Sequence, residues 1–91
     1  MWVLITVVLK LSESGKFVPV YENAILHKTI ESCEVNMEKV YSDLELLKAN
    51  YPVTLEYRYN DENNKYIRFK YKPDYTKPEK ERFYHCLKVK N

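Results

Sequence analysis

Ninety-one residues suffice for one domain with a hydrophobic core but leave little room for a deep catalytic cavity as well. Hydrophobic residues form 45% of the chain and charged residues 31%, which excludes a disordered chain. The apolar stretch at residues 2–9 is shorter than the ~20 residues of a membrane helix and lacks the flanks of a signal peptide. We therefore expect a single domain over residues 1–91 that is cytoplasmic and has no membrane partner.

The net charge of +2 is too small to indicate nucleic-acid binding by itself, but the charges are unevenly distributed. Residues 29–51 hold two basic and five acidic side chains, whereas residues 52–91 hold ten basic and six acidic ones. The molecule is therefore expected to have one acidic and one basic region.

The first part of the chain predicts two strands. Residues 2–11 are rich in β-branched side chains and apolar at both alternating sets of positions, which is typical of a central strand covered at least partly on both faces. A turn over residues 12–15 leads to a second strand over residues 16–26. Pro19 cannot donate a hydrogen bond to a neighbouring strand, so this second strand is expected at a sheet edge.

Residues 29–50 predict one long amphipathic helix. Apolar side chains recur at alternating spacings of three and four, which places them in one narrow arc. Thr29 can cap the start, and a residue before Pro52 is pushed out of the helical region, which favours an end at Asn50. The predicted buried stripe consists of Ile30, Cys33, Met37, Val40, Leu44, Leu47 and Tyr51.

Three more strands are expected after the helix. Residues 53–59 and 66–72 alternate around the polar loop 60–65, which is typical of a β-hairpin, for example with Tyr57 opposite Phe69. A charged loop over residues 73–82 precedes a final strand over residues 82–90. The predicted inward residues are Val53, Leu55, Tyr57, Tyr59, Ile67, Phe69 and Tyr71 in the hairpin, Phe83, His85, Leu87 and Val89 in the last strand, and Tyr21.

The order of these elements is β-β-α-β-β-β. It predicts an α+β fold, in which an antiparallel β-sheet of about five strands has one long amphipathic helix packed on one face.

No pattern in the chain indicates catalysis, a cofactor or a metal. The single glycine argues against a phosphate-cradling loop, and no nucleophile-elbow, zinc-protease or P-loop motif occurs. His27, Cys33, His85 and Cys86 lack the short paired spacing of zinc ligands. We therefore expect a non-enzymatic protein with no cofactor and no metal site.

The two cysteines allow either two thiols or one disulfide. Cys33 lies on the buried stripe of the helix, whereas the predicted alternation of the last strand turns Cys86 outward, beside Lys88. Because no export signal is present, we expect two reduced thiols. A Cys33–Cys86 disulfide that joins the helix to the sheet is the alternative.

One face of the hairpin is basic. It combines cations that could contact phosphates with a ring that could stack on a base. The plainer interpretation is a solvated sheet face on which Glu56 pairs with a neighbouring base. The candidate phosphate-binding residues are Arg58, Tyr66, Arg68, Lys70 and Lys72.

The helix carries an acidic flank beside its apolar stripe. Val35 and Leu46 lie nearly opposite the stripe, so we expect both to be exposed near these charges. Such a surface could bind a partner protein or a second copy of the chain. The candidate partner-binding residues are Glu31, Glu34, Glu38 and Glu45, with Tyr75 in the charged loop.

Three short stretches resemble small, uncharacterised phage and bacterial proteins. They are the apolar strand that starts directly at Met1-Trp2-Val3-Leu4, the segment Thr29-Ile-Glu-Ser-Cys-Glu34, and the late segment Phe83-Tyr-His-Cys-Leu-Lys88. Many such phage proteins are accessory factors that bind a host protein, including inhibitors of CRISPR and other antiviral systems. The resemblance implies a binding role and transfers no active-site residue.

Three functional hypotheses follow. The first is a phage-type accessory protein that binds and inhibits a host protein, such as an antiviral defence component, in the host cytoplasm; its acidic helix would compete with nucleic acid for a basic groove. The second is a protein that binds nucleic acid or a signalling nucleotide through the basic hairpin face. The third is a structural subunit that forms a homodimer.

Overall fold

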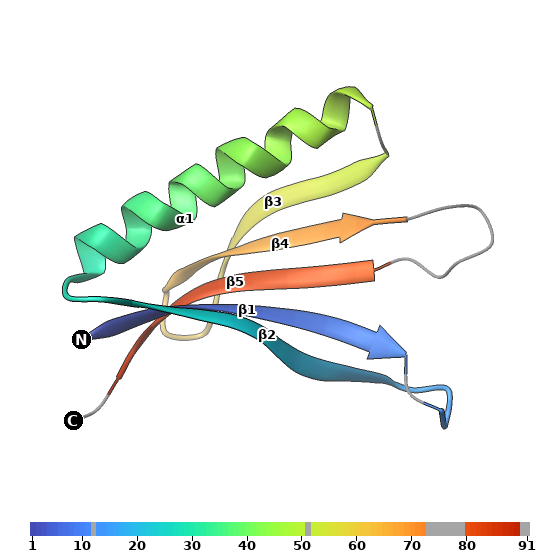
Figure 1. Cartoon of the computed structure of the whole chain (residues 1–91), viewed down its shortest axis with the longest axis horizontal. Coiled ribbons are helices and arrows are strands. Elements are labelled where there is room, and N and C mark those ends of the chain that lie inside the picture. The colour runs from blue at the N-terminus through green and yellow to red at the C-terminus, as the bar shows by residue number, and fades with distance from the viewer. Residues whose placement is uncertain (12, 51, 73–79, 90–91) are drawn as a thin grey trace.

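Five strands form one antiparallel sheet, and a helix lies across one of its faces (Figure 1). The computed structural model describes residues 1–11, 13–50, 52–72 and 80–89. The predicted α+β fold and the predicted order of elements are confirmed. The elements are β1 (Trp2–Leu11), β2 (Phe17–His27), α1 (Ile30–Glu45) with a following 3₁₀ turn η1 (Leu46–Ala49), β3 (Val53–Tyr59), β4 (Lys65–Tyr71) and β5 (Lys80–Lys88).

The strand order in the sheet is β2-β1-β5-β4-β3. The strand that contains Pro19 therefore lies at an edge, as predicted, and β1 lies between β2 and β5. The register of β1 and β2 shifts between Thr6 and Val7, which pair with Asn23 and Tyr21 and leave Glu22 as the extra residue of a bulge. The first and last strands of the chain are thus neighbours in the interior of the sheet.

The helix begins where its sequence predicts. The Thr29 hydroxyl accepts a hydrogen bond from the backbone N–H of Ser32 at 3.1 Å, which satisfies one of the unpaired donors at the start of α1. The side chain of His27, at the end of β2, bonds to both Ser32 (2.9 Å) and Asn36 (3.1 Å). These contacts fix the angle at which the chain leaves the sheet and enters the helix.

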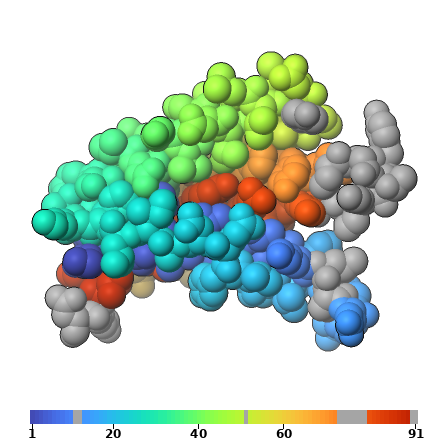
Figure 2. Space-filling view, viewed as in Figure 1, coloured from blue at the N-terminus to red at the C-terminus, as the bar shows by residue number. Residues whose placement is uncertain are grey.

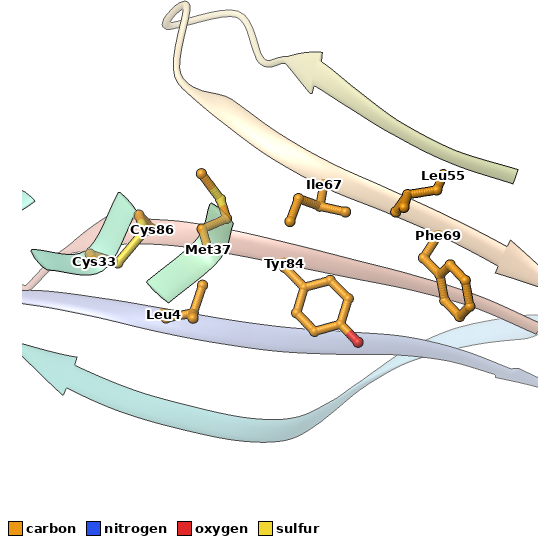
Figure 3. Close-up of a cluster of buried hydrophobic side chains, with 8 residues drawn as sticks. All are labelled: Leu4, Cys33, Met37, Leu55, Ile67, Phe69, Tyr84 and Cys86. Atoms are coloured by element: carbon orange, nitrogen blue, oxygen red, sulfur yellow. A yellow bond between two sulfur atoms is a disulfide. The ribbon is translucent and has the colours of Figure 1, made fainter. Parts of the chain in front are cut away.

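The hydrophobic core lies between α1 and one face of the sheet (Figure 3). Cys33 and Met37 are its fully buried helix residues, while Ile30, Val40 and Leu44 of the predicted stripe pack against it half-buried. Tyr51, the last residue of that stripe, lies outside the described residues. The core cluster consists of Leu4, Cys33, Met37, Leu55, Ile67, Phe69, Tyr84 and Cys86.

The side chains of β5 alternate in the opposite phase from the prediction. Tyr84 and Cys86 are buried beneath α1, so Phe83 and His85 point to the other face of the sheet. The predicted phase turned Lys88 away from the helix. In the structure Lys88 lies at the exposed end of β5, so the core excludes this lysine without any reversal of the strand.

The same phase brings Cys33 and Cys86 together. Their Cα atoms are 6.1 Å apart and their sulfur atoms are bonded, which joins α1 to β5 across 53 residues of sequence (Figure 3). The prediction of two reduced thiols is therefore wrong, and the disulfide alternative is correct. Lys88 favours the phase that turns Cys86 away from the helix, whereas the bond to Cys33 requires Cys86 to face the helix.

Two tyrosines expected in the core are exposed. Tyr21 is 76% exposed because the bulge at Glu22 shifts the phase of β2, and Tyr59 is 62% exposed at the end of β3. In the hairpin, Tyr57 pairs with Ile67, two residues from the example register, and the pairs keep the predicted even sum. Tyr57 packs in the core as expected and stacks on Tyr41 with 4.3 Å between ring centres.

We expect loss of the Cys33–Cys86 bridge to lower the free energy of unfolding by about 4 kcal/mol, because the bridge closes a long loop in the unfolded chain. Urea denaturation of the wild type with and without reductant measures this change. The Cys33→Ala/Cys86→Ala variant is the control, because reductant should leave its stability unchanged. Two titratable thiols in the unfolded, unreduced wild type would contradict the bridge.

Candidate functional site

The face of the sheet opposite α1 is apolar along β2, β1 and β5. Val3 of β1 pairs with Leu26 on one side and Leu87 on the other, and paired residues of antiparallel strands point to the same face. Within the described residues, no helix or strand packs on this face (Figure 1). We call this side of the sheet the open face. Its apolar residues are Val3, Ile5, Val7 and Leu9 of β1, Phe17, Pro19, Tyr21, Ala24 and Leu26 of β2, and Phe83 and Leu87 of β5.

Exposure distinguishes the open face from an ordinary sheet surface. Phe17 is 53% exposed, Leu26 64% and Leu87 41%, so large apolar side chains reach solvent on β2 and β5, on either side of β1. At one end the face is hollowed by a depression of about 220 Å³ that Leu9, Phe17, Lys70 and Glu81 line. Contiguous apolar surface of this kind usually marks a site of association.

An aromatic cluster lies beside the apolar strands. Tyr66 of β4 stacks on His85 of β5 with 4.6 Å between ring centres, and Phe83 lies 6.2 Å from the Tyr66 ring. Burial lowers the pKa of His85 below its ordinary value of 6.5. His85 is therefore neutral at pH 7, and its ring adds to the apolar character of the open face.

Ion pairs form the border of the open face on β3, β4 and β5. The guanidinium of Arg68 donates to Glu81 at 2.5 Å and to Glu56 at 3.1 Å, and Glu56 also lies 3.4 Å from Arg58. The hydrogen bonds to Glu81 and then to Glu56 raise the pKa of Arg68 above its usual value. The predicted pairing of Glu56 with neighbouring bases is confirmed, and it covers both arginines of the basic hairpin face.

Four of the five candidate phosphate-binding residues share one face. Arg58, Tyr66, Arg68 and Lys70 all lie on the open face, as alternation predicted. Lys72 follows the end of β4 and lines a cavity near the helix instead. The structure thus brings together most of the predicted set but neutralises much of its charge with Glu56 and Glu81.

The acidic flank of α1 lies on the opposite side of the molecule from the open face. Glu31, Glu34, Glu38 and Glu45 are all exposed. Among the described residues, none of these four forms an ion pair. Val35 and Leu46 are 65% and 73% exposed, as predicted. Tyr75, the remaining candidate partner-binding residue, lies outside the described residues.

The acidic flank extends toward the β3 edge of the sheet. Burial raises the pKa of Tyr57, and the charges of Glu38, Tyr41 and Glu45 raise it further. Glu38 and Glu45 therefore lie on the side of the helix nearest β3. The Lys65 ammonium lies 4.4 Å from the centre of the Tyr57 ring.

Among the described residues, His27 and the two cysteines show no catalytic or metal-binding arrangement. His27 is held by the helix, because Asn36 donates to Nε2 and Nδ1 then donates to the Ser32 hydroxyl. Both cysteines are in the disulfide and cannot act as nucleophiles. Within the described part of the chain, no three His, Cys, Asp or Glu side chains gather in a way that could hold a metal ion.

The described helices are all too short or too polar to cross a membrane. Comparisons with protein-family models, with curated proteins and with solved structures found no match to this chain.

We expect acid to destabilise the fold through His85. The folded state disfavours the protonated ring, so the unfolded chain binds this proton more readily. The contribution of neutral His85 to the stability of the fold is fully present above the unfolded pKa of about 6.5. It is lost as the pH falls through that value toward the lower pKa of the folded state. Urea denaturation at about pH 7.5 and about pH 5.5 should show a larger loss of stability in the wild type than in His85→Phe. Equal losses in the two proteins would contradict the assignment.

Proposed function

We propose that this chain is a non-enzymatic binding protein of the phage accessory type, which binds and inhibits a host protein, such as an antiviral defence component, in the host cytoplasm. The observation that supports a binding role most strongly is the open face. An isolated domain gains nothing from large exposed apolar side chains on one face of its sheet, whereas a protein–protein contact buries them.

We assign the open face to a second copy of the same chain. The sheet has five strands of 7 to 11 residues. With a rise of ~3.3 Å per residue and a spacing of ~4.8 Å between strands, the whole open face, including its charged border, measures on the order of 700 Å². One side of a standard interface buries about 800 Å², so the face alone nearly provides a stable dimer contact. Its charged border holds carboxylates and guanidiniums together, which lets a symmetric copy place opposite charges across the contact.

A dimer formed this way has four layers, in the order helix, sheet, sheet, helix. Its two acidic flanks lie on the outer sides, away from the contact. Each flank presents exposed glutamates that form no ion pair among the described residues, with Val35 and Leu46 as apolar neighbours. A partner that offers a basic groove, such as a nucleic-acid-binding protein, has the complementary charge. In this proposal the open face serves assembly, and the acidic flank serves inhibition.

Binding of nucleic acid or a signalling nucleotide is the second candidate. The stacked Tyr66 and His85 rings beside Arg58 favour it, because a base can stack on such rings while a cation contacts its phosphate. The pairing of Arg68 with two carboxylates counts against it. The two candidates differ in whether the open face binds protein or phosphate.

We expect the wild type to elute as a dimer of about 22 kDa, twice the 11.0 kDa chain, in size exclusion with light scattering. The Leu26→Asp/Leu87→Asp variant should be monomeric, because two carboxylates on the apolar strip cannot be buried against a second copy. Val35→Asp/Leu46→Asp is the matched control: it adds the same charges at exposed apolar positions of the helical segment and should remain a dimer.

A monomeric wild type over the whole accessible concentration range would overturn the assignment to a second copy. Absorbance at 260 and 280 nm, recorded in the same run, tests the second candidate. A raised 260 nm signal that disappears at high salt would favour a nucleic-acid ligand on the basic hairpin face.

We expect Glu34→Lys/Glu38→Lys to weaken inhibition of the host system by about tenfold or more, because the reversed charges repel a basic groove. The measurement is the titre of a defence-sensitive phage on cells that express each variant with the defence system. Glu13→Lys/Glu62→Lys makes the same reversal at exposed glutamates in the turn and the hairpin loop and should keep full activity. Equal titres for the two double variants would count against the acidic flank.

A further inference from the structure

A second feature lies on the helix side of the sheet and is independent of the open face. A cavity of about 290 Å³ lies where the helical segment ends above the hairpin. Atoms of β4 and β5 are visible there, below the C-terminal part of α1 (Figure 2). Its apolar lining comes from three segments: Leu44 and Leu47, then Val53, then Phe69 and Tyr71. The volume is close to the ~300 Å³ lower bound of pockets that hold small molecules.

Two cations line this apolar cavity. Lys72 is exposed, whereas the Arg82 side chain is only 30% exposed and its guanidinium lies 5.7 Å from the centre of the Tyr71 ring. Arg82 shares the inward phase of Tyr84 and Cys86, so it reaches the helix side of the sheet beyond the end of the core. A cation inside an apolar pocket usually has a fixed anionic partner.

The protein provides only part of that partner. Arg82 Nη2 lies 3.5 Å from Glu22 Oε1, a long contact with the bulge residue of β2. Its Nε is buried and has no hydrogen-bond acceptor within the described residues, although the Arg82 side chain also hydrogen-bonds to Tyr84. Among the described residues, Arg82 thus has a hydroxyl and a distant carboxylate as partners, and no close carboxylate.

We propose that this cavity binds a small amphipathic anion, such as a medium-chain carboxylate, with its apolar chain among Leu44, Leu47 and Val53 and its carboxylate at Arg82. The carboxylate pairs with the Arg82 guanidinium, whose contact with Glu22 is long, and Lys72 adds a second positive charge at the rim. A neutral molecule of the same length fills the same apolar space but gains only a weaker, uncharged hydrogen bond. A cationic molecule is repelled by both side chains.

Titration of the full-length protein with octanoate and with 1-octanol, followed by calorimetry and by NMR of the backbone amides, tests this proposal. We expect octanoate to bind at least about tenfold more tightly than 1-octanol, with shifts centred on Val53, Phe69 and Tyr71. The Arg82→Met variant should bind the two ligands equally, whereas Arg58→Met, which removes an arginine from the open face, should bind octanoate like the wild type.

A further variant tests the cavity without touching Arg82. Leu47 is 38% exposed, so Leu47→Asp places a carboxylate in the lining at little cost to the core and should abolish octanoate binding. Equal affinity of the wild type for octanoate and 1-octanol, no binding of either, or shifts centred on the open face would overturn the proposal.

Discussion

The contact between α1 and β5 determines most of the structure. Cys33 and Met37 are the fully buried residues of the helix, and Cys33 is bonded to Cys86 in the interior of the sheet. This bond fixes which side of β5 faces the helix, and the pairing of β5 with β1 and β4 then fixes the same side for its neighbours. A single cross-link thus separates the residues of the sheet into a buried face and an open face.

One helix cannot cover both faces of a five-stranded sheet. The helix-facing side of β1, β5, β4 and β3 becomes the core, while the apolar residues of β2, β1 and β5 on the other side remain uncovered within the described residues. Their exposure is a direct consequence of a single helix lying on a sheet whose inner strand is apolar on both faces. The cavity with Arg82 lies where residues of the end of the helical segment meet β3, β4 and β5.

The charged side chains also divide between the two sides of the molecule. Glu56 lies beside Arg58 of its own strand and beside Arg68 of the next strand, and Glu81 also lies beside Arg68. Both arginines of the basic hairpin face therefore form ion pairs at the border of the open face. Among the described residues, Glu31, Glu34, Glu38 and Glu45 of α1 form no ion pair, so the flank of the helix stays acidic. Two surfaces of different chemistry therefore lie on opposite sides of one small molecule, one apolar and the other acidic.

Local patterns in the sequence determined the elements, the β-β-α-β-β-β order, the Thr29 cap and the edge position of the strand with Pro19, because periodicity, capping and proline act within a few residues. Local patterns could not determine which side chains of β5 face the helix. Lys88 and Cys86 favour opposite phases, and only the approach of Cys33 from a distant helix decides between them. The strand order, the bulge at Glu22, the pairing of the arginines and the cavity at Arg82 likewise depend on contacts between segments far apart in the chain, and these form only when the tertiary structure does.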